Sequence, residues 1–329
     1  TCCDSCNTHC PTGIPIPSSG IKSISKVATL LSLVVMGLWI VGIFFTDRWG
    51  WSQWLTWIPT SIVLCLVALT IIIDSIAKRV KTIIGLLIVF IAMLFWFVSK
   101  EHRFLSTGIQ TGEIRLVGWT MSHSKKLVSK ESAEEVVRLN GDITLLTHGW
   151  YVRGEPSIKE WLGTGSRRVI SGPFTILTKL NVIEVRTLVA SDGIYISMFV
   201  IDTTESLGKP LVLWGIDLPS DLNIPRIAIA RRAKRLLESI DTLQPDIVMG
   251  DFNMTRNSYS IKTLFPELVD AGDDGGTGLL ASFPMQIPLY HIDHTLMDDG
   301  LVCDSYTLVN PHIGRHRVQI TELHTEKSK

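Results

Sequence analysis

The sequence predicts a soluble α/β domain preceded by three membrane-spanning helices. Long apolar runs fill the first hundred residues, whereas short apolar runs separated by turn residues begin at residue 113. We therefore expect a cysteine-rich segment with a linker at residues 1–26, the membrane helices within residues 27–98, a second linker at 99–112 and one α/β domain at 113–329.

Three apolar segments, residues 27–45, 55–73 and 82–98, contain no Asp, Glu, Lys or Arg. Each is close to the length that a helix needs to cross a hydrocarbon layer of about 30 Å. Helices buried in a soluble bundle normally keep a polar face, and these segments have none. Tryptophans gather where the segments would meet the membrane–water interface, at positions Trp49, Trp51, Trp54, Trp57 and Trp96.

The basic residues that flank these segments indicate the orientation. Five lie on the N-terminal side and four on the side of the α/β domain: Lys22, Lys26, Lys78, Arg79 and Lys81 against Arg48, Lys100, Arg103 and Arg115. The compact turn AKRVK at residues 77–81 favours the first side as the cytoplasmic one. We therefore expect a cytoplasmic N-terminus and an extracytoplasmic C-terminal domain.

Four cysteines and one histidine occur within the first ten residues, TCCDSCNTHC. Cys3 and Cys6 have the C-x-x-C spacing that binds a zinc ion or an iron–sulfur cluster, and Cys10 lies close by. A zinc site usually needs a second pair of ligands, which this segment does not provide. Disulfides, lipid-modified thiols and an unstructured tail are therefore alternatives to a metal site here.

Six apolar runs predict strands, at residues 114–119, 142–147, 174–178, 194–201, 211–217 and 246–250. The clearest helical pattern spans residues 226–244. Its apolar face comprises Ile229, Ala233, Leu236, Leu237 and Ile240. The basic residues between them predict a solvated face or, alternatively, a contact with anionic lipid headgroups.

The segment DIVMGDFN places Asp251 and Asn253 directly after an apolar strand. In open α/β sheets, functional sites gather where strands end at their carboxyl edge. A carboxylate and an amide at such an edge can bind a divalent metal or orient a water, although the same residues also form ordinary turns.

An ordered series of motifs resembles the endonuclease/exonuclease/phosphatase superfamily, which has the DNase I-like fold. The series comprises IRLVGWT, LNGDITLLTH, GIDLPSD, GDFN, SFP, IDH and the glycine-bounded histidine of GRHR. The resemblance covers residues 113–324, and the order of the motifs makes it specific. It implies a four-layer sandwich of two β-sheets flanked by helices, with metal-dependent cleavage of phosphate esters at the strand ends.

The resemblance assigns catalytic roles to four residues of this chain. Asp251 and Asn253 match the pair that orients the phosphate, His316 matches the catalytic histidine, and Asp293 matches the aspartate that holds that histidine.

Four other positions depart from the family pattern. Thr120 replaces an asparagine, His148 a metal-binding glutamate, Arg315 the aspartate before the histidine, and Asp217 the histidine of H-L-P-S. Two carboxylates that magnesium would use are therefore lost. Asp251, His148 and Asp217 could instead hold zinc or manganese. Alternatively, Arg315 binds a phosphate and replaces the charge of the metal. His148 is also compatible with a purely structural role.

Bacterial members with membrane helices ahead of this domain are associated with the cell envelope. The resemblance therefore implies a membrane-anchored phosphoesterase of the bacterial plasma membrane, acting on a phosphorylated small molecule or on a lipid-linked phosphate or pyrophosphate. The alternative is a catalytically impaired pseudoenzyme that binds a phosphorylated ligand or a protein partner. Zero net charge and the membrane tether disfavour a nucleic acid substrate.

Overall fold

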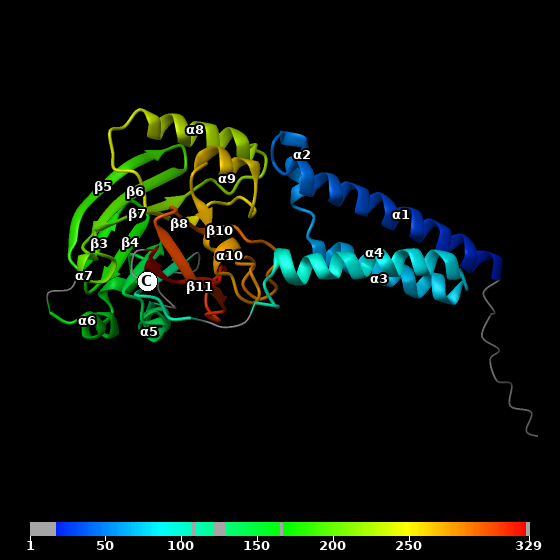
Figure 1. The fold of residues 1–329 in the computed structure, drawn as a ribbon, viewed down its shortest axis with the longest axis horizontal. Coiled ribbons are helices and arrows are strands. Elements are labelled where there is room, and N and C mark those ends of the chain that lie inside the picture. The colour runs from blue at the N-terminus through cyan, green and yellow to red at the C-terminus, as the bar shows by residue number, and fades with distance from the viewer. Residues whose placement is uncertain (1–17, 107–109, 122–128, 165–166, 327–329) are drawn as a thin grey trace, which may run out of the picture.

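The computed structural model describes residues 18–106, 110–121, 129–164 and 167–326. Long helices form a bundle that projects from a two-sheet domain (Figure 1). The proposed metal ligands Cys3, Cys6 and Cys10 lie outside the described residues.

The bundle contains the apolar segments that the sequence predicts to span a membrane. Its helices are α1 (Ser18–Phe45), α2 (Gly50–Thr56), α3 (Thr60–Ile76) and α4 (Val80–Trp96), followed by the π-helical turn η1 (Phe97–Glu101). Two helices, Gly20–Phe45 and Val80–Glu101, are long and apolar enough to cross a membrane. A third span exists if α2 and α3, which meet at a bend of 62°, form one crossing.

The prediction of one unbroken helix over residues 55–73 was wrong. The chain leaves the helical conformation at residues 57–59, between α2 and α3. Pro59 explains the break, because proline has no backbone N–H and disfavours helical geometry at the residue before it.

Polar side chains inside the bundle bond to one another. The buried carboxylate of Asp74 accepts hydrogen bonds from the hydroxyls of Ser25 and Thr29 and pairs with Arg79 at 3.1 Å. Because hydrocarbon offers no hydrogen-bond partners, such groups must satisfy one another. This network fixes α1 against α3 at the end of the bundle away from the soluble domain (Figure 1).

The soluble domain contains two six-stranded sheets. The first has the order β11 (Leu301–Val309), β12 (Val318–Thr325), β1 (Ile114–Thr120), β2 (Ile143–Thr147), β4 (Phe174–Thr178) and β3 (Arg167–Ser171). The second has the order β5 (Val182–Ser191), β6 (Ile194–Ile201), β7 (Leu211–Asp217), β8 (Ile247–Asp251), β10 (Asp293–Met297) and β9 (Val269–Asp270).

Helices cover the outer face of each sheet. The first sheet packs on α5 (Ser129–Leu139), η2 (Val152–Gly154) and α6 (Pro156–Leu162), and the second on α8 (Arg226–Glu238) and α9 (Tyr259–Leu264). The short helices α7 (Thr204–Leu207) and α10 (Ala271–Asp274) join strands. A third apolar cluster fills the space between the sheets. The predicted four-layer sandwich is therefore confirmed, and it has the DNase I-like arrangement.

Three loops of the domain rest on the nearest ends of α1, α2 and α3. One loop follows β7, one follows β8 and one precedes β10. The hydrogen bonds are Gln53 Nε2 to Leu222 O (2.8 Å), Arg226 N to Gln53 Oε1 (2.7 Å), Tyr259 N to Thr46 Oγ1 (3.1 Å), Ser260 N to Asp47 Oδ1 (3.1 Å) and Tyr290 OH to Trp57 O (3.3 Å). The bundle therefore touches the loops at one particular edge of the second sheet.

Gly250 allows β7 and β8 to approach closely just before Asp251. Its φ is +145°, and a Cβ at this position would overlap the carbonyl oxygen of Ile216 on the neighbouring strand. Only glycine adopts this conformation without strain.

We therefore expect Gly250→Ala to lower the free energy of unfolding by at least about 2 kcal/mol, because strain and steric overlap add. Thermal unfolding of the detergent-solubilised chain measures this as a fall in midpoint of roughly 4–8 °C. Gly154→Ala is the matched control, since a Cβ there meets nothing within 4 Å. Equal midpoints for the two variants would contradict the packing argument.

Candidate active site

Three aspartates end or begin neighbouring strands at the edge that faces the bundle. Asp217 of β7 is the register partner of Asp251 of β8, and Asp251 is the register partner of Asp293 of β10. Directly opposed residues on paired strands have Cα atoms about 4.5–5.5 Å apart. The register therefore aligns three largely buried carboxyl groups in one row.

The first sheet contributes a histidine to this row. His316 precedes β12, and its Nδ1 lies 2.8 Å from Asp293 Oδ2. Thr120 at the end of β1 donates its hydroxyl to the other oxygen of Asp293 at 2.6 Å. The predicted contact between Asp293 and His316 is therefore confirmed. Asp293 is only 1% exposed, so the pair is shielded from water.

The charges of this cluster are coupled. Burial lowers the pKa of His316, but Asp293 and Asp251 outweigh this effect and raise it to about 9. Burial raises the pKa of Asp293, whereas the ion pair with His316 lowers it below its ordinary value overall. Burial and the neighbouring Asp293 raise the pKa of Asp251 well above its ordinary value. At neutral pH, His316 is a cation. Asp251 has no ion pair of its own among the described residues, although the charges of His316 and the buried Arg226 both act on it.

Asn253 adopts a left-handed conformation, with φ of 51°, in the loop after β8. Its backbone N–H donates to Asp251 Oδ1 at 3.0 Å, and its side-chain amide donates to the carbonyl of Leu218 at 2.9 Å. Asn253 therefore orients Asp251 and connects the β8 loop to the β7 loop. The catalytic role that the family resemblance gives it stays a prediction.

His148 and Asp217 form a pair of their own. Nε2 of His148 lies 2.9 Å from Asp217 Oδ2, and half of the His148 side chain is exposed. His148 follows β2 of the first sheet and Asp217 ends β7 of the second, so this contact also bridges the two sheets. In this structure Nε2 of His148 bonds to Asp217, so this nitrogen is not free to bind an ion. The proposed ion site of His148, Asp251 and Asp217 therefore stays a prediction.

Arg315 directly precedes His316 and is exposed. Its Cζ lies 5.5 Å from the ring centroid of Phe283, and the ring of His316 lies 5.0 Å from the same centroid. Among the described residues Arg315 has no ion-pair partner. Its guanidinium is therefore available to an anion that reaches His316.

The ligand atoms of Asp251, Asp293 and His316 all lie within 4.8 Å of one another, a spacing compatible with one metal ion. Asp293 and His316 bind each other, which leaves Asp251 as the principal free donor. Burial and the neighbouring Asp293 raise the pKa of Asp251, and a cation beside it would offset both effects by stabilising the carboxylate. The residues therefore fit a divalent ion held mainly by Asp251.

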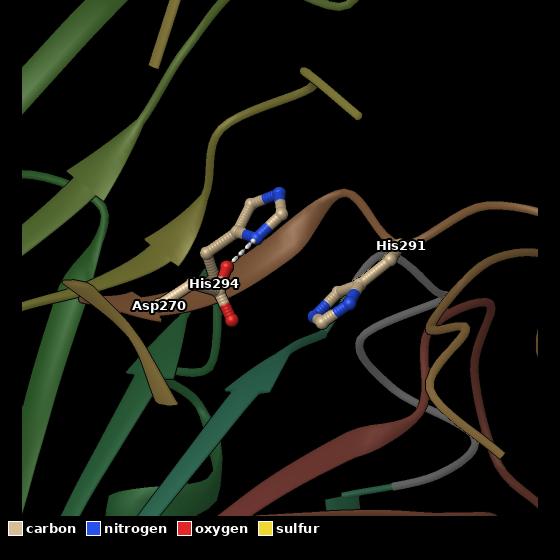
Figure 2. Close-up of side chains that lie close together, drawn as sticks. All are labelled: Asp270, His291 and His294. Carbon is tan, nitrogen blue, oxygen red and sulfur yellow. Dashed lines mark hydrogen bonds and ion pairs between the residues drawn. The ribbon is translucent and has the colours of Figure 1, made fainter. Parts of the chain in front are cut away.

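A second group of potential ligands comprises Asp270, His291 and His294 (Figure 2). Of these, only His294 falls in one of the family motifs, IDH. His294 Nδ1 lies 2.7 Å from Asp270 Oδ2, and His294 Nε2 lies 2.9 Å from the carbonyl of Met254. A carbonyl only accepts, and the bond to His294 lowers the pKa of Asp270 despite its burial. Both nitrogens of His294 therefore carry protons, and this group is an internal ion pair rather than a metal centre.

No protein-family model and no curated protein sequence matches this chain. Solved structures match its fold. The mannosyl-6-phosphatase of Bacteroides thetaiotaomicron VPI-5482 is 13% identical with a TM-score of 0.51, and the alignment covers 64% of this chain and 99% of the phosphatase. An endonuclease/exonuclease/phosphatase family protein of the same species is 14% identical with a TM-score of 0.48, over 64% of this chain and 94% of that one. At such identities the similarity to the phosphatase shows the fold alone, and the similarity to the second structure carries no argument.

Titration of His316 tests the electrostatics of the site. We expect chelator-treated protein to retain a protonated His316 at pH 7.5, with a pKa near 9. This value lies above the ordinary pKa, so the His316–Asp293 pair stabilises the fold fully below about pH 6.5 and loses this contribution as pH rises through about 9. Asp293→Asn should lower the pKa of His316 by about 1–3 units.

Histidine NMR signals, assigned with His316→Gln, measure this pKa. Asp304→Asn is the matched control, because it removes the carboxylate of a different buried pair, with His324, and should leave the pKa of His316 unchanged. A His316 that titrates near pH 6.5 in the wild type would refute the proposed charge coupling.

Proposed function

We propose that the protein is a membrane-anchored phosphoesterase that hydrolyses a phosphate ester presented at the membrane surface, with lipid-linked phosphates or pyrophosphates as the substrate class. One observation carries this proposal: the loops beside Asp217, Asp251 and Asp293 are the loops that rest on the membrane helices. The cluster therefore faces the side from which a lipid-borne phosphate would arrive. A phosphatase with the same fold is consistent with this reaction class.

His316 is suited to binding the phosphoryl group. Its Nδ1–H donates to Asp293, which fixes the orientation of the ring and leaves Nε2–H for a phosphoryl oxygen. The imidazolium form, favoured by the raised pKa, also neutralises charge that develops on that oxygen. Arg315 lies over the same Phe283 ring and can bind a second phosphoryl oxygen.

Asp251 has the properties of a general base. Burial and Asp293 raise its pKa, which makes its carboxylate a stronger base than that of an ordinary aspartate toward an attacking water. The Asn253 N–H holds one carboxylate oxygen and leaves the other to the water. A divalent ion bound by Asp251 would supply additional positive charge to the phosphoryl oxygens. Magnesium, manganese and zinc are all candidates for that ion.

A pseudoenzyme is the second candidate, favoured by what Thr120 and His148 do. The resemblance places an amide and a carboxylate at these positions, but Thr120 bonds to Asp293 and His148 bonds to Asp217. Thr120 and His148 therefore stabilise the cluster, but neither adds a ligand for a hard cation. In this alternative, Arg315 and His316 bind a phosphorylated ligand that is not hydrolysed.

Hydrolysis assays separate the two candidates. We expect the reconstituted chain to hydrolyse a lipid pyrophosphate faster than a soluble phosphodiester, with Asp251→Asn lowering kcat by about 10²-fold or more. Magnesium, manganese and zinc are compared in separate reactions. Asp299→Asn, at an exposed turn, is the control that should retain activity. Binding of the lipid without turnover under any of the three ions would establish the pseudoenzyme instead.

We also propose that the N-terminus is cytoplasmic and that the catalytic domain lies outside the cytoplasm. The AKRVK turn lies at the end of the bundle opposite the domain, which supports this orientation (Figure 1). Arg79 is paired with Asp74, so Lys78 and Lys81 carry the unpaired positive charge of that turn.

Cysteine labelling tests the orientation. Cys303 is a poor reporter, because it is buried and its pKa is raised by burial to about 12. In a background without the other cysteines, an impermeant maleimide should label Asp299→Cys in intact spheroplasts. Lys78→Cys, on the opposite side, should react only after permeabilisation. The reverse pattern would place the domain in the cytoplasm.

A further inference from the structure

A cavity of about 540 Å³ lies between the bundle and the loops of the soluble domain. Trp39, Ile43 and Phe44 contribute an apolar wall from α1, whereas the domain contributes polar loop residues. Asp251, Asp293 and His316 are not among the residues that line it. The cavity is therefore a separate site, apolar on the membrane side and polar on the domain side.

The charged residues of the cavity are mainly basic. Four cationic side chains meet two acidic ones: Arg48, Lys100, Arg256 and Lys262 against Glu101 and Asp273. Lys100 and Lys262 are exposed and have no ion-pair partner in the described part of the chain. An anion would therefore be attracted to the polar end of the cavity.

Arg256 presents an unused donor to the cavity. Its side chain is 8% exposed; Nη2 donates to the carbonyl of Lys100, and Nε lies 3.6 Å from Asp273 Oδ1. The buried Nη1 has no hydrogen-bond acceptor among the described residues. An unsatisfied buried guanidinium N–H is costly, so this atom indicates where a ligand would supply an acceptor.

His291 presents an unused acceptor. Its Nε2 lies 3.1 Å from the hydroxyl of Tyr306, and that hydroxyl donates to Gln319 Oε1 at 3.1 Å. The hydroxyl therefore accepts from Nε2–H, which leaves a lone pair on Nδ1. This nitrogen is buried and has no donor among the described residues.

The unused donor and the unused acceptor are neighbours. A Cβ built on Gly272 would lie 2.9 Å from Asp270 Oδ1, 3.3 Å from His291 Cε1 and 3.4 Å from Arg256 Nη1. The Asp270 carboxylate lies beside the same point, so an anionic oxygen of a ligand must lie on the Arg256 side. One small group can therefore reach both side chains. It must offer an anionic oxygen to Arg256 and a hydrogen-bond donor to His291.

We propose that this cavity binds an anionic phospholipid with a hydroxylated headgroup, whose phosphate contacts Arg256 and whose hydroxyl donates to His291 Nδ1. The acyl chains would lie along the apolar wall of α1. Phosphatidylglycerol has this chemistry. A lipid at this position would hold the domain loops against the bilayer, and its binding does not require hydrolysis at Asp251.

Binding of dioctanoyl phosphatidylglycerol to the purified full chain, followed by native mass spectrometry, tests the charge requirement. We expect saturable binding that Lys100→Gln/Lys262→Gln weakens about tenfold. The matched control is Lys130→Gln/Lys159→Gln, which neutralises two exposed lysines on α5 and α6 and should leave the affinity unchanged. The test replaces the two lysines and not Arg256, because Arg256 also bonds to the carbonyl of Lys100 and to Asp273. Equal affinity for dioctanoyl phosphatidylcholine would overturn the proposal.

Two further ligands test the hydroxyl and the lipid source. Dioctanoyl phosphatidylethanol has the same charge without a hydroxyl, and we expect it to bind about fivefold more weakly. His291→Phe should abolish that difference while retaining binding. Equal binding of the two lipids by the wild type would refute the role of His291. Glycerol 3-phosphate should not compete at concentrations that saturate the lipid; equal competition would show a soluble phosphate site instead.

Discussion

The hydrogen-bonded pair of Asp293 and His316 is the contact on which the candidate active site depends. It joins β10 of the second sheet to the segment before β12 of the first, and Thr120 of β1 adds a third attachment to the same carboxylate. The imidazolium pairs with one carboxylate, so the second buried carboxyl group, Asp251, has no ion pair of its own among the described residues. This imbalance makes the site selective for an added positive charge. A divalent ion at Asp251 or the guanidinium of Arg315 would supply it, and the choice between them separates an active enzyme from a binding protein.

The sequence predicted the central strands well because their apolar runs are continuous. Each of the six predicted runs corresponds to a strand whose ends differ by at most one residue, including β2, β7 and β8. Strands β3, β5, β9 and β11 were not predicted. Of these, β5 is largely exposed and carries charged residues, so its pattern resembles a loop. The predicted helix over residues 226–244 ends earlier, at Glu238. Its apolar face does pack on the second sheet, as predicted.

The site was predictable only in part, because motifs identify residues and not their partners. The family motifs identified Asp251, Asn253, Asp293 and His316, and the structure brings these residues to one edge. The contact of His148 with Asp217 depends on how two sheets pack face to face, which no local pattern encodes. The pair of Asp270 and His294 is likewise formed by strands that are distant in sequence. The histidine that follows Asp293 is His294, and no sequence pattern predicted its contact with Asp270.

The alternation of side chains along β10 explains how two separate polar clusters can adjoin one strand. Asp293, Thr295 and Met297 face the other sheet, where Asp293 meets His316 and Thr295 meets Gln319. His294 and Leu296 face the helical layer, where His294 meets Asp270 and stacks on His291. Because successive residues point to opposite faces, Asp293 and His294 belong to two separate polar clusters. The first face carries the candidate active site, whereas the second lies beside Arg256 and the proposed lipid site. Membrane attachment and phosphate chemistry can therefore be served by opposite faces of the same strand without competing for the same side chains.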